Sequence, residues 1–153
     1  MNKKKIFLIE DDADLLYGLE SEFSADNFEI ATSYGDEEIS ELVNNIRSFK
    51  PDFIVIDLIL PKTDGFDIIK KIKADDGINQ EQIFVFTDLS EEDSRIRSID
   101  VGTDYIFFKD DFDTYAFAEK VKKIITNREN IEANSPEESS DIDEGEDPGI
   151  VFA

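Results

Sequence analysis

The sequence predicts an α/β protein in which a parallel sheet lies between two layers of helices. Two observations support this prediction. Five short segments, at 6–9, 28–33, 53–56, 83–86 and 105–108, alternate with segments whose apolar residues recur at helical spacing. Four of the five short segments are apolar throughout, which is typical of parallel strands that helices cover on both faces.

The elements follow one another in a simple order. The strand at 6–9 precedes a helix, the alternating segment at 28–33 is a second strand, and the strands at 53–56, 83–86 and 105–108 each precede a further helix. Right-handed crossovers and the strand order 2-1-3-4-5 then give a flavodoxin-like (βα)5 three-layer sandwich. The predicted helices have apolar stripes at Leu15, Leu16, Leu19 and Phe23; Ile39, Leu42, Val43 and Ile46; Phe66, Ile68, Ile69 and Ile72; Ile96 and Ile99; and Phe117, Val121, Ile124 and Ile125.

Composition narrows the function. The 153 residues suit one domain, and the absence of cysteine excludes disulfides, thiol nucleophiles and thiolate metal sites. The absence of histidine excludes an imidazole base and a phosphohistidine on this chain. A net charge of −22 argues against direct binding of nucleic acid. Since no apolar stretch has the length of a signal peptide core or a membrane span, we expect a cytoplasmic protein without membrane contact.

The charge also divides the chain. Residues 129–153 contain nine acidic residues and no Lys or Arg, so we expect a domain over 1–128 and a disordered acidic tail over 129–153. The apolar segment at 150–152 is an exception within this tail. Three interpretations stay open for it: an appendage that only solubilises the domain, a segment that docks on the domain and regulates it, or a ligand for the output partner.

Polar residues follow four of the predicted strands. They are the Glu10-Asp11-Asp12 cluster, Asp57, Thr87 and Lys109. Taken singly, each has an ordinary explanation as a helix cap, a turn former or a solvated strand end. Ligands of open α/β sheets, however, bind beyond the carboxyl ends of the strands, where these side chains should converge.

The residue types favour phosphate chemistry. Carboxylates from Glu10, Asp11 and Asp57 suit Mg²⁺ (or Mn²⁺), which prefers hard oxygen ligands and leaves room for water and phosphate. The Asp57 carboxylate can act as a nucleophile toward phosphorus and form an acyl phosphate. The Lys109 ammonium offsets negative charge and can contact a phosphoryl oxygen.

The chain resembles the receiver domain of two-component response regulators over about residues 3 to 126. The resemblance rests on the segment from Asp57 to Gly65 with Leu60-Pro61 and Thr63-Asp64, on Thr87 and Lys109, and on Gly102-Thr103-Asp104. It implies that Asp57 is the phosphoacceptor and that Thr87 and Lys109 are the switch pair that binds the phosphoryl group. It also implies a metal site of Glu10, Asp11, Asp57 and the Ile59 backbone carbonyl, with Asp12 as a secondary candidate.

Three positions depart from the family pattern. Asp88 replaces the usual small residue after the switch threonine, so it is a candidate modulator that repels a phosphodonor. Asp110 replaces the usual proline after the lysine, which favours a trans peptide bond. Ile106 occupies the usual position of the aromatic switch, and Tyr105 and Phe107 flank it.

The function expected from this resemblance is a phosphoacceptor response regulator in a two-component phosphorelay, and not an enzyme. A histidine kinase or histidine phosphotransfer protein would supply the phosphoryl group, and a downstream protein would receive the signal by protein–protein contact. The alternative is a receiver-like docking module that works without phosphate. A haloacid-dehalogenase-like phosphohydrolase is disfavoured, since such enzymes carry a second Asp two residues after the first, where this chain has Ile59.

Overall fold

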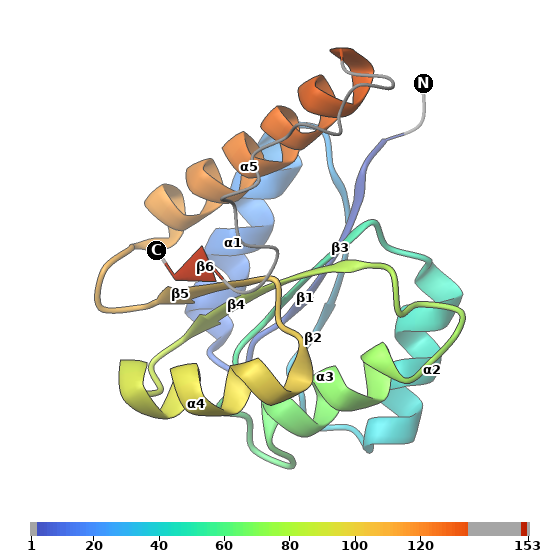
Figure 1. Cartoon of the computed structure of the whole chain (residues 1–153), viewed down its shortest axis with the longest axis vertical. Coiled ribbons are helices and arrows are strands. Elements are labelled where there is room, and N and C mark those ends of the chain that lie inside the picture. Colours follow the sequence, from blue (N-terminus) through green and yellow to red (C-terminus); the bar gives the residue numbers. More distant parts are fainter. Residues whose placement is uncertain (1–2, 135–150, 153) are drawn as a thin grey trace.

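The computed structural model describes residues 3–134 and 151–152, and it consists of parallel strands and the helices that connect them (Figure 1). The strands are β1 (Lys5–Ile9), β2 (Glu29–Ser33), β3 (Phe53–Ile56), β4 (Gln82–Thr87), β5 (Tyr105–Phe108) and β6 (Val151–Phe152). The helices are α1 (Ala13–Ala25), α2 (Ile39–Phe49), α3 (Gly65–Lys73), α4 (Glu91–Val101) and α5 (Thr114–Asn134). Within these ranges no helix is both long and apolar enough to cross a membrane.

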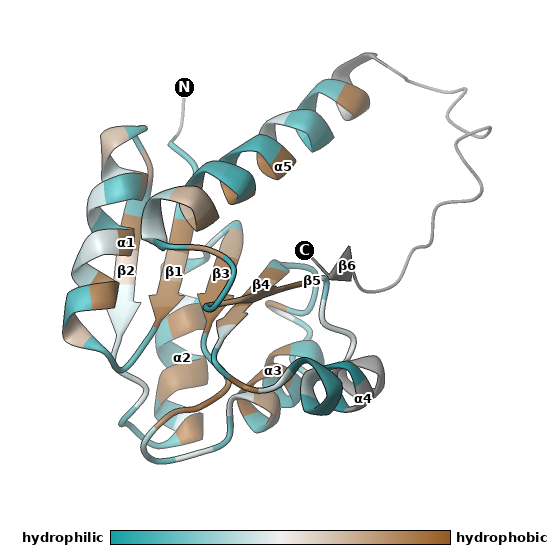
Figure 2. Cartoon of the chain, turned by 90° about the vertical axis from the view of Figure 1, so that its left-hand side faces the viewer, coloured by the Kyte–Doolittle hydropathy of each residue, from teal (hydrophilic) through white to brown (hydrophobic). Residues whose placement is uncertain are grey.

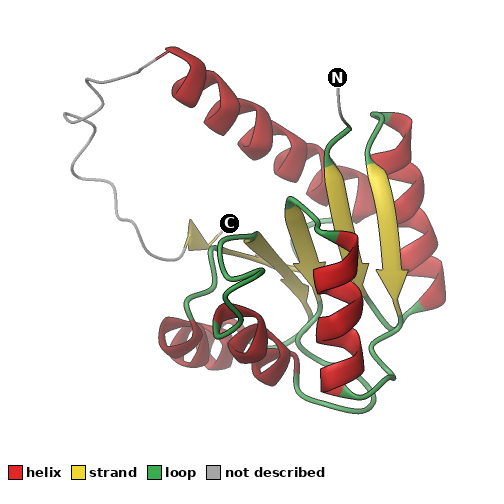
Figure 3. Cartoon of the chain, turned by 90° about the vertical axis from the view of Figure 1, so that its right-hand side faces the viewer, coloured by secondary structure: helices red, strands yellow, loops and turns green. Residues whose placement is uncertain are grey.

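The sheet has the strand order β2-β1-β3-β4-β5-β6, and every pair in it is parallel. Helices α1 and α5 lie together on one face, and α2, α3 and α4 form a row on the other (Figures 1 and 3). The predicted α/β class and the strand order 2-1-3-4-5 are therefore confirmed. The sixth strand was not predicted.

The apolar strands β1, β3, β4 and β5 bury residues on both of their faces, and Figure 2 shows their predominantly hydrophobic colour. In β1, Phe7 and Ile9 pack in the layer with α2 and α3, whereas Ile6 and Leu8 pack in the layer with α1 and α5. This alternation continues along β3, β4 and β5. Because both faces of the sheet are covered, the only parts of the central strands that can carry polar chemistry are their ends.

Local signals place the loops that follow β1 and β3. Asp12 is the N-cap of α1, and its Oδ1 accepts hydrogen bonds from the backbone N–H groups of Asp14 and Leu15. Asp64 caps α3 in the same way through Phe66. The next residue must be glycine, because a Cβ at Gly65 would lie 2.6 Å from the backbone oxygen of Asp57. The loop after β3 is thus packed directly against the strand end that carries Asp57.

The C-terminal part of the chain differs from the sequence-based expectation. Helix α5 continues to Asn134, so residues 129–134 are helical and the expected boundary at 128 falls within a helix. Glu129 pairs with Lys4 near the start of β1, and residues 129–131 are exposed, as in a solvated helix. The rest of the expected tail, 135–150, lies outside the described residues, as do the side chains of Ile96 and Ile99.

Candidate functional site

Three side chains from three strand ends meet at the carboxyl edge of the sheet. Glu10 follows β1 and Asp57 follows β3, and both are buried, with 2% and 3% of their surface exposed. The Asp57 backbone N–H donates to the carbonyl of Ile9, which fixes the two strand ends side by side. Lys109, which follows β5, places its Nζ 2.7 Å from Asp57 Oδ2 and 3.0 Å from Glu10 Oε1. The structure thus brings together predicted site residues that are far apart in sequence.

The electrostatics of this group are unbalanced, since two buried carboxylates share one ammonium. Burial and, second, the neighbouring charge of Asp57 raise the pKa of Glu10 from 4.5 to about 7, although the charge and hydrogen bond of Lys109 act in the opposite direction. Burial alone would lower the pKa of Lys109, but its hydrogen bond to Asp57 and the charges of both carboxylates raise it above the ordinary value. The site therefore favours an additional cation or a proton on Glu10.

Asp11 completes a set of oxygen ligands. Carboxylate oxygens of Glu10, Asp11 and Asp57 all lie within 4.8 Å of one another, with Asp11 exposed to solvent. Hard oxygen donors at this spacing, with one side open, suit a small divalent cation. Asp12 does not belong to this group because its carboxylate caps α1. Its backbone N–H nevertheless donates to Glu10 Oε2 at 3.1 Å and so helps to orient that carboxylate.

The loop after Asp57 supports the same carboxylate. The Ile59 backbone N–H donates to Asp57 Oδ1 at 3.1 Å, and Ile59 forms an isolated antiparallel bridge with Asp64. The side chain of Ile59 is half exposed. Whether the Ile59 carbonyl ligates a metal stays a prediction.

Thr87 is fully buried at the end of β4. Its Oγ1 accepts a hydrogen bond from the backbone N–H of Leu89 at 3.2 Å, and its carbonyl accepts one from the backbone N–H of Lys109 at 2.9 Å. The hydroxyl thus stabilises its own loop, while the backbone links the ends of β4 and β5. Asp88 is exposed and, together with Asp110 and Asp111, lines a small hollow of about 170 Å³ beside Thr87.

The structure also describes the other two positions that depart from the family pattern, Asp110 and Ile106. The peptide bond between Lys109 and Asp110 is trans, as expected, and Lys109 still reaches both carboxylates. Ile106 is fully buried in the layer with α2 and α3. Tyr105 stacks on Phe84 with ring centroids 5.0 Å apart, and Phe107 packs in the opposite layer, the one with α1 and α5. Neither aromatic ring therefore lies on the face of the sheet that Ile106 occupies.

The sequence does not predict one contact, which joins α4 to the end of the loop that follows Asp57 and to the start of α3. Arg97 on α4 forms an ion pair with Asp64 at 2.8 Å, and its guanidinium lies 4.3 Å from the centre of the Phe66 ring. No sequence spacing could have indicated this contact, because it joins residues of two different βα units.

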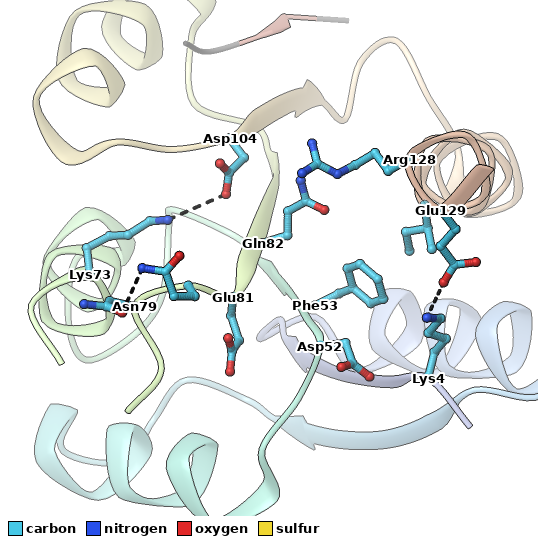
Figure 4. Close-up of a pocket in the computed structure, with 12 residues that line it drawn as sticks. Lys4, Asp52, Phe53, Lys73, Asn79, Glu81, Gln82, Asp104, Arg128 and Glu129 are labelled. Carbon is cyan, nitrogen blue, oxygen red and sulfur yellow. Dashed lines mark hydrogen bonds and ion pairs between the residues drawn. The ribbon is translucent and has the colours of Figure 1, made fainter. Parts of the chain in front are cut away.

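A separate polar pocket of about 380 Å³ lies at the opposite edge of the sheet, near the first residues of β3 and β4 (Figure 4). Its charges are mixed and largely paired with one another, as in the ion pair between Lys73 and Asp104 at 3.7 Å. This pocket lacks the convergent carboxylates of the site beside Asp57.

Comparisons with known proteins identify the same family. A family model described as "Response regulator receiver domain" matches residues 6–136. The "Transcriptional regulatory protein PrrA" of Mycobacterium leprae is 26% identical over 124 residues, which cover 81% of this chain and 49% of that protein. The chain therefore spans about half the length of this curated relative.

Solved structures agree with this result. A two-component response regulator from Clostridium difficile superposes with a TM-score of 0.70 at 25% sequence identity. The alignment covers 82% of this chain and 98% of the Clostridium chain. A CheY-like response regulator receiver domain protein from Methanospirillum hungatei has a TM-score of 0.71 at 17% identity, with 84% and 98% covered. Family match, relatives and fold lead to one conclusion: this chain belongs to the receiver domain family of response regulators.

Proposed function

We propose that Asp57 accepts a phosphoryl group from the phosphohistidine of a histidine kinase or a histidine phosphotransfer protein. The observation that carries this proposal is the position of the buried Asp57 carboxylate, with Lys109 Nζ at 2.7 Å on one side and Glu10 and Asp11 on the other. In the transfer, an Asp57 oxygen forms a bond to phosphorus while the phosphorus–nitrogen bond of the donor breaks. The donor imidazole nitrogen leaves with the electron pair of that bond.

Each neighbour of Asp57 then has a defined task. Lys109 contacts Asp57 Oδ2 and can turn to a phosphoryl oxygen, where its charge offsets the negative charge that spreads over the transferring group. The Ile59 N–H holds Oδ1 and orients the carboxylate. Glu10, Asp11 and Asp57 would hold Mg²⁺ or Mn²⁺, and the Ile59 carbonyl would be a further ligand. Such an ion, when bound, supplies positive charge to the carboxylates and to the phosphoryl oxygens.

We also propose that Thr87 and Lys109 bind the phosphoryl group on Asp57 and change position when it is present. The added group carries a charge of about −1.5 to −2. The Thr87 hydroxyl, which now accepts from Leu89, would donate to a phosphoryl oxygen, and Lys109 would pair with the same group. Both side chains end strands next to α4 and α5, so their movement would shift the surface formed by α4, β5 and α5. A downstream protein would bind that surface.

The test is phosphorylation by acetyl phosphate with intact mass spectrometry. We expect one phosphate adduct on the parent chain in Mg²⁺, none in EDTA and none on Asp57→Asn. Asp52→Asn is a matched control, because Asp52 is exposed just before β3 and should leave the adduct unchanged. An adduct that persists in Asp57→Asn would refute the assignment. An unmodified parent chain would instead favour the docking module that works without phosphate.

Asp88→Ala should raise the initial rate of this phosphorylation, by about two- to threefold at low salt. Asp88 is exposed and lines the hollow beside Thr87, so we expect its charge to repel an incoming anionic donor. Added salt should reduce the difference, since screening shortens the reach of exposed charges to about 10 Å at 0.1 M. Initial rates at two ionic strengths test this, with Asp93→Ala on α4 as a control for the loss of one exposed charge. Equal rates for Asp88→Ala and the parent at both salt concentrations would show that the charge of Asp88 does not repel the phosphodonor.

A further inference from the structure

The described C-terminal residues form a strand on the domain. Val151 and Phe152 of β6 pair in parallel with Tyr105 and Ile106 of β5 (Figures 1 and 3). Without β6, β5 would be the last strand on this side of the sheet. An edge strand presents backbone N–H and C=O groups that can pair with any extended chain. We call this outer side of β5, at Tyr105 and Ile106, the β5 edge.

The β5 edge is a firm support for such a chain. Ile106 and Phe107 are buried in opposite layers of the core, and Tyr105 stacks on Phe84 of the neighbouring strand. Strand β5 therefore keeps its position whether or not a sixth strand is paired with it. The sequence of β6 is β-branched and aromatic, which suits a strand.

We propose that the β5 edge is a binding site for an extended segment of a partner protein, and that Val151 and Phe152 occupy this site within the chain. The partner segment would add to the sheet as a parallel strand, and it would have to displace β6. This mode of recognition derives affinity from the main-chain hydrogen bonds and specificity from the side chains that flank them.

The direction of pairing and the surrounding charge define the partner. Because β6 is parallel to β5, a chain that continues past the level of Ile106 runs toward the loop after β5. This loop carries the exposed residues Asp110, Asp111 and Asp113, and Glu91 at the start of α4 lines the same hollow as Asp110 and Asp111. We therefore expect a partner segment with two or three β-branched or aromatic residues, followed by Lys or Arg.

Displacement of β6 sets the apparent affinity. Strand β6 belongs to the same chain as the β5 edge, so a partner segment competes with an intramolecular strand. If β6 occupies the edge nine-tenths of the time, a competing peptide binds about tenfold more weakly than to the open edge. The strand thus raises the concentration needed to fill the edge by the same factor for every competing peptide.

The test uses the full chain in EDTA without a phosphodonor, so that its outcome does not depend on the role of Asp57. Val151→Pro removes a backbone N–H and disfavours the strand, whereas the matched control Val151→Thr keeps both the N–H and a β-branched side chain. The first measurement is amide hydrogen exchange of Tyr105, Ile106 and Phe107. We expect at least one of these amides to exchange faster in Val151→Pro than in Val151→Thr. Equal exchange of all three would overturn the pairing.

The second measurement is fluorescence anisotropy with two labelled peptides. Both contain residues 147–152 of this chain, and one continues with two lysines while the other continues with two glutamates. We expect the lysine peptide to bind Val151→Pro about tenfold more tightly than Val151→Thr. We also expect it to bind more tightly than the glutamate peptide, by a margin that added salt reduces. Failure of both peptides to bind Val151→Pro, or equal binding to both variants, would overturn the proposed site.

Discussion

Lys109→Ala should lower the free energy of unfolding at pH 8 in EDTA by about 3 kcal/mol. Lys109 is the one cation that contacts both buried carboxylates among the described residues, with Nζ 2.7 Å from Asp57 and 3.0 Å from Glu10. Its removal leaves Asp57 and Glu10 without their shared cation, so Glu10 must either carry a charge beside Asp57 or hold a proton that the unfolded chain has released at this pH. Truncation of a surface lysine, by contrast, costs little because exposed ion pairs contribute only up to about 1 kcal/mol.

The loss should depend on pH in a defined direction. The pKa of Glu10 is about 7, so at pH 5.5 this side chain is mostly neutral and the repulsion is small. We therefore expect Lys109→Ala to cost less at pH 5.5 than at pH 8. The measurement is urea unfolding at both values, with Lys123→Ala on the exposed side of α5 as the control. A second substitution, Glu10→Gln, should recover part of the loss at pH 8. No recovery in the double variant would show that charge repulsion is not the cause.

Much of the fold follows from patterns that a single sequence contains. Strands that are buried on both faces must be apolar throughout. The sequence therefore predicts β1, β3, β4 and β5 as continuous apolar segments, such as Ile6 to Ile9. Parallel strands carry their ligand chemistry at their carboxyl ends, and this rule alone predicts that Glu10, Asp57 and Lys109 converge. The structure places Lys109 within hydrogen-bond distance of both Glu10 and Asp57.

Other features depend on contacts that no local pattern contains. Segment 129–134 reads as a polar tail, yet it continues α5, because a solvated helix and a disordered segment have similar composition. The apolar residues before Ala153 are visible in the sequence, but their pairing with β5 depends on the edge that the other five strands leave open. The contact between Arg97 and Asp64 is set by how α4 packs against α3. Asp12 illustrates a different ambiguity. An Asp after a strand suits a helix cap and a metal ligand equally well, and the structure shows Asp12 as the cap of α1.

The stability of the metal-free protein should fall as the pH rises from about 4.5 through 7. Glu10 holds its proton more tightly in the folded chain, where its pKa is about 7, than in the unfolded chain, where it is 4.5. Its contribution to stability is therefore fully present below the unfolded pKa and is lost as the pH passes the folded pKa. The difference corresponds to about 3 kcal/mol. Urea unfolding in EDTA between pH 4.5 and 8 measures it, and Glu10→Gln should remove most of this slope.

Affinity for Mg²⁺ should change with pH in the opposite sense. A carboxylate must lose its proton before it can ligate the metal, so binding at pH 6 should be about tenfold weaker than at pH 8. Above the Glu10 pKa of about 7 the affinity should level off. Isothermal titration calorimetry at constant ionic strength measures this dependence for the parent chain and for two variants. Glu10→Gln should bind Mg²⁺ more weakly and with little dependence on pH.

Asp12→Asn is the matched control for this titration. Asparagine caps a helix about as well as aspartate, so the substitution removes a neighbouring charge and preserves the start of α1. Because Asp12 lies outside the group formed by Glu10, Asp11 and Asp57, the variant should keep the pH dependence of the parent and most of its affinity. Equal losses of affinity in Asp12→Asn and Glu10→Gln would mean that the net charge of the loop, and not ligation by Glu10, governs the binding of the cation.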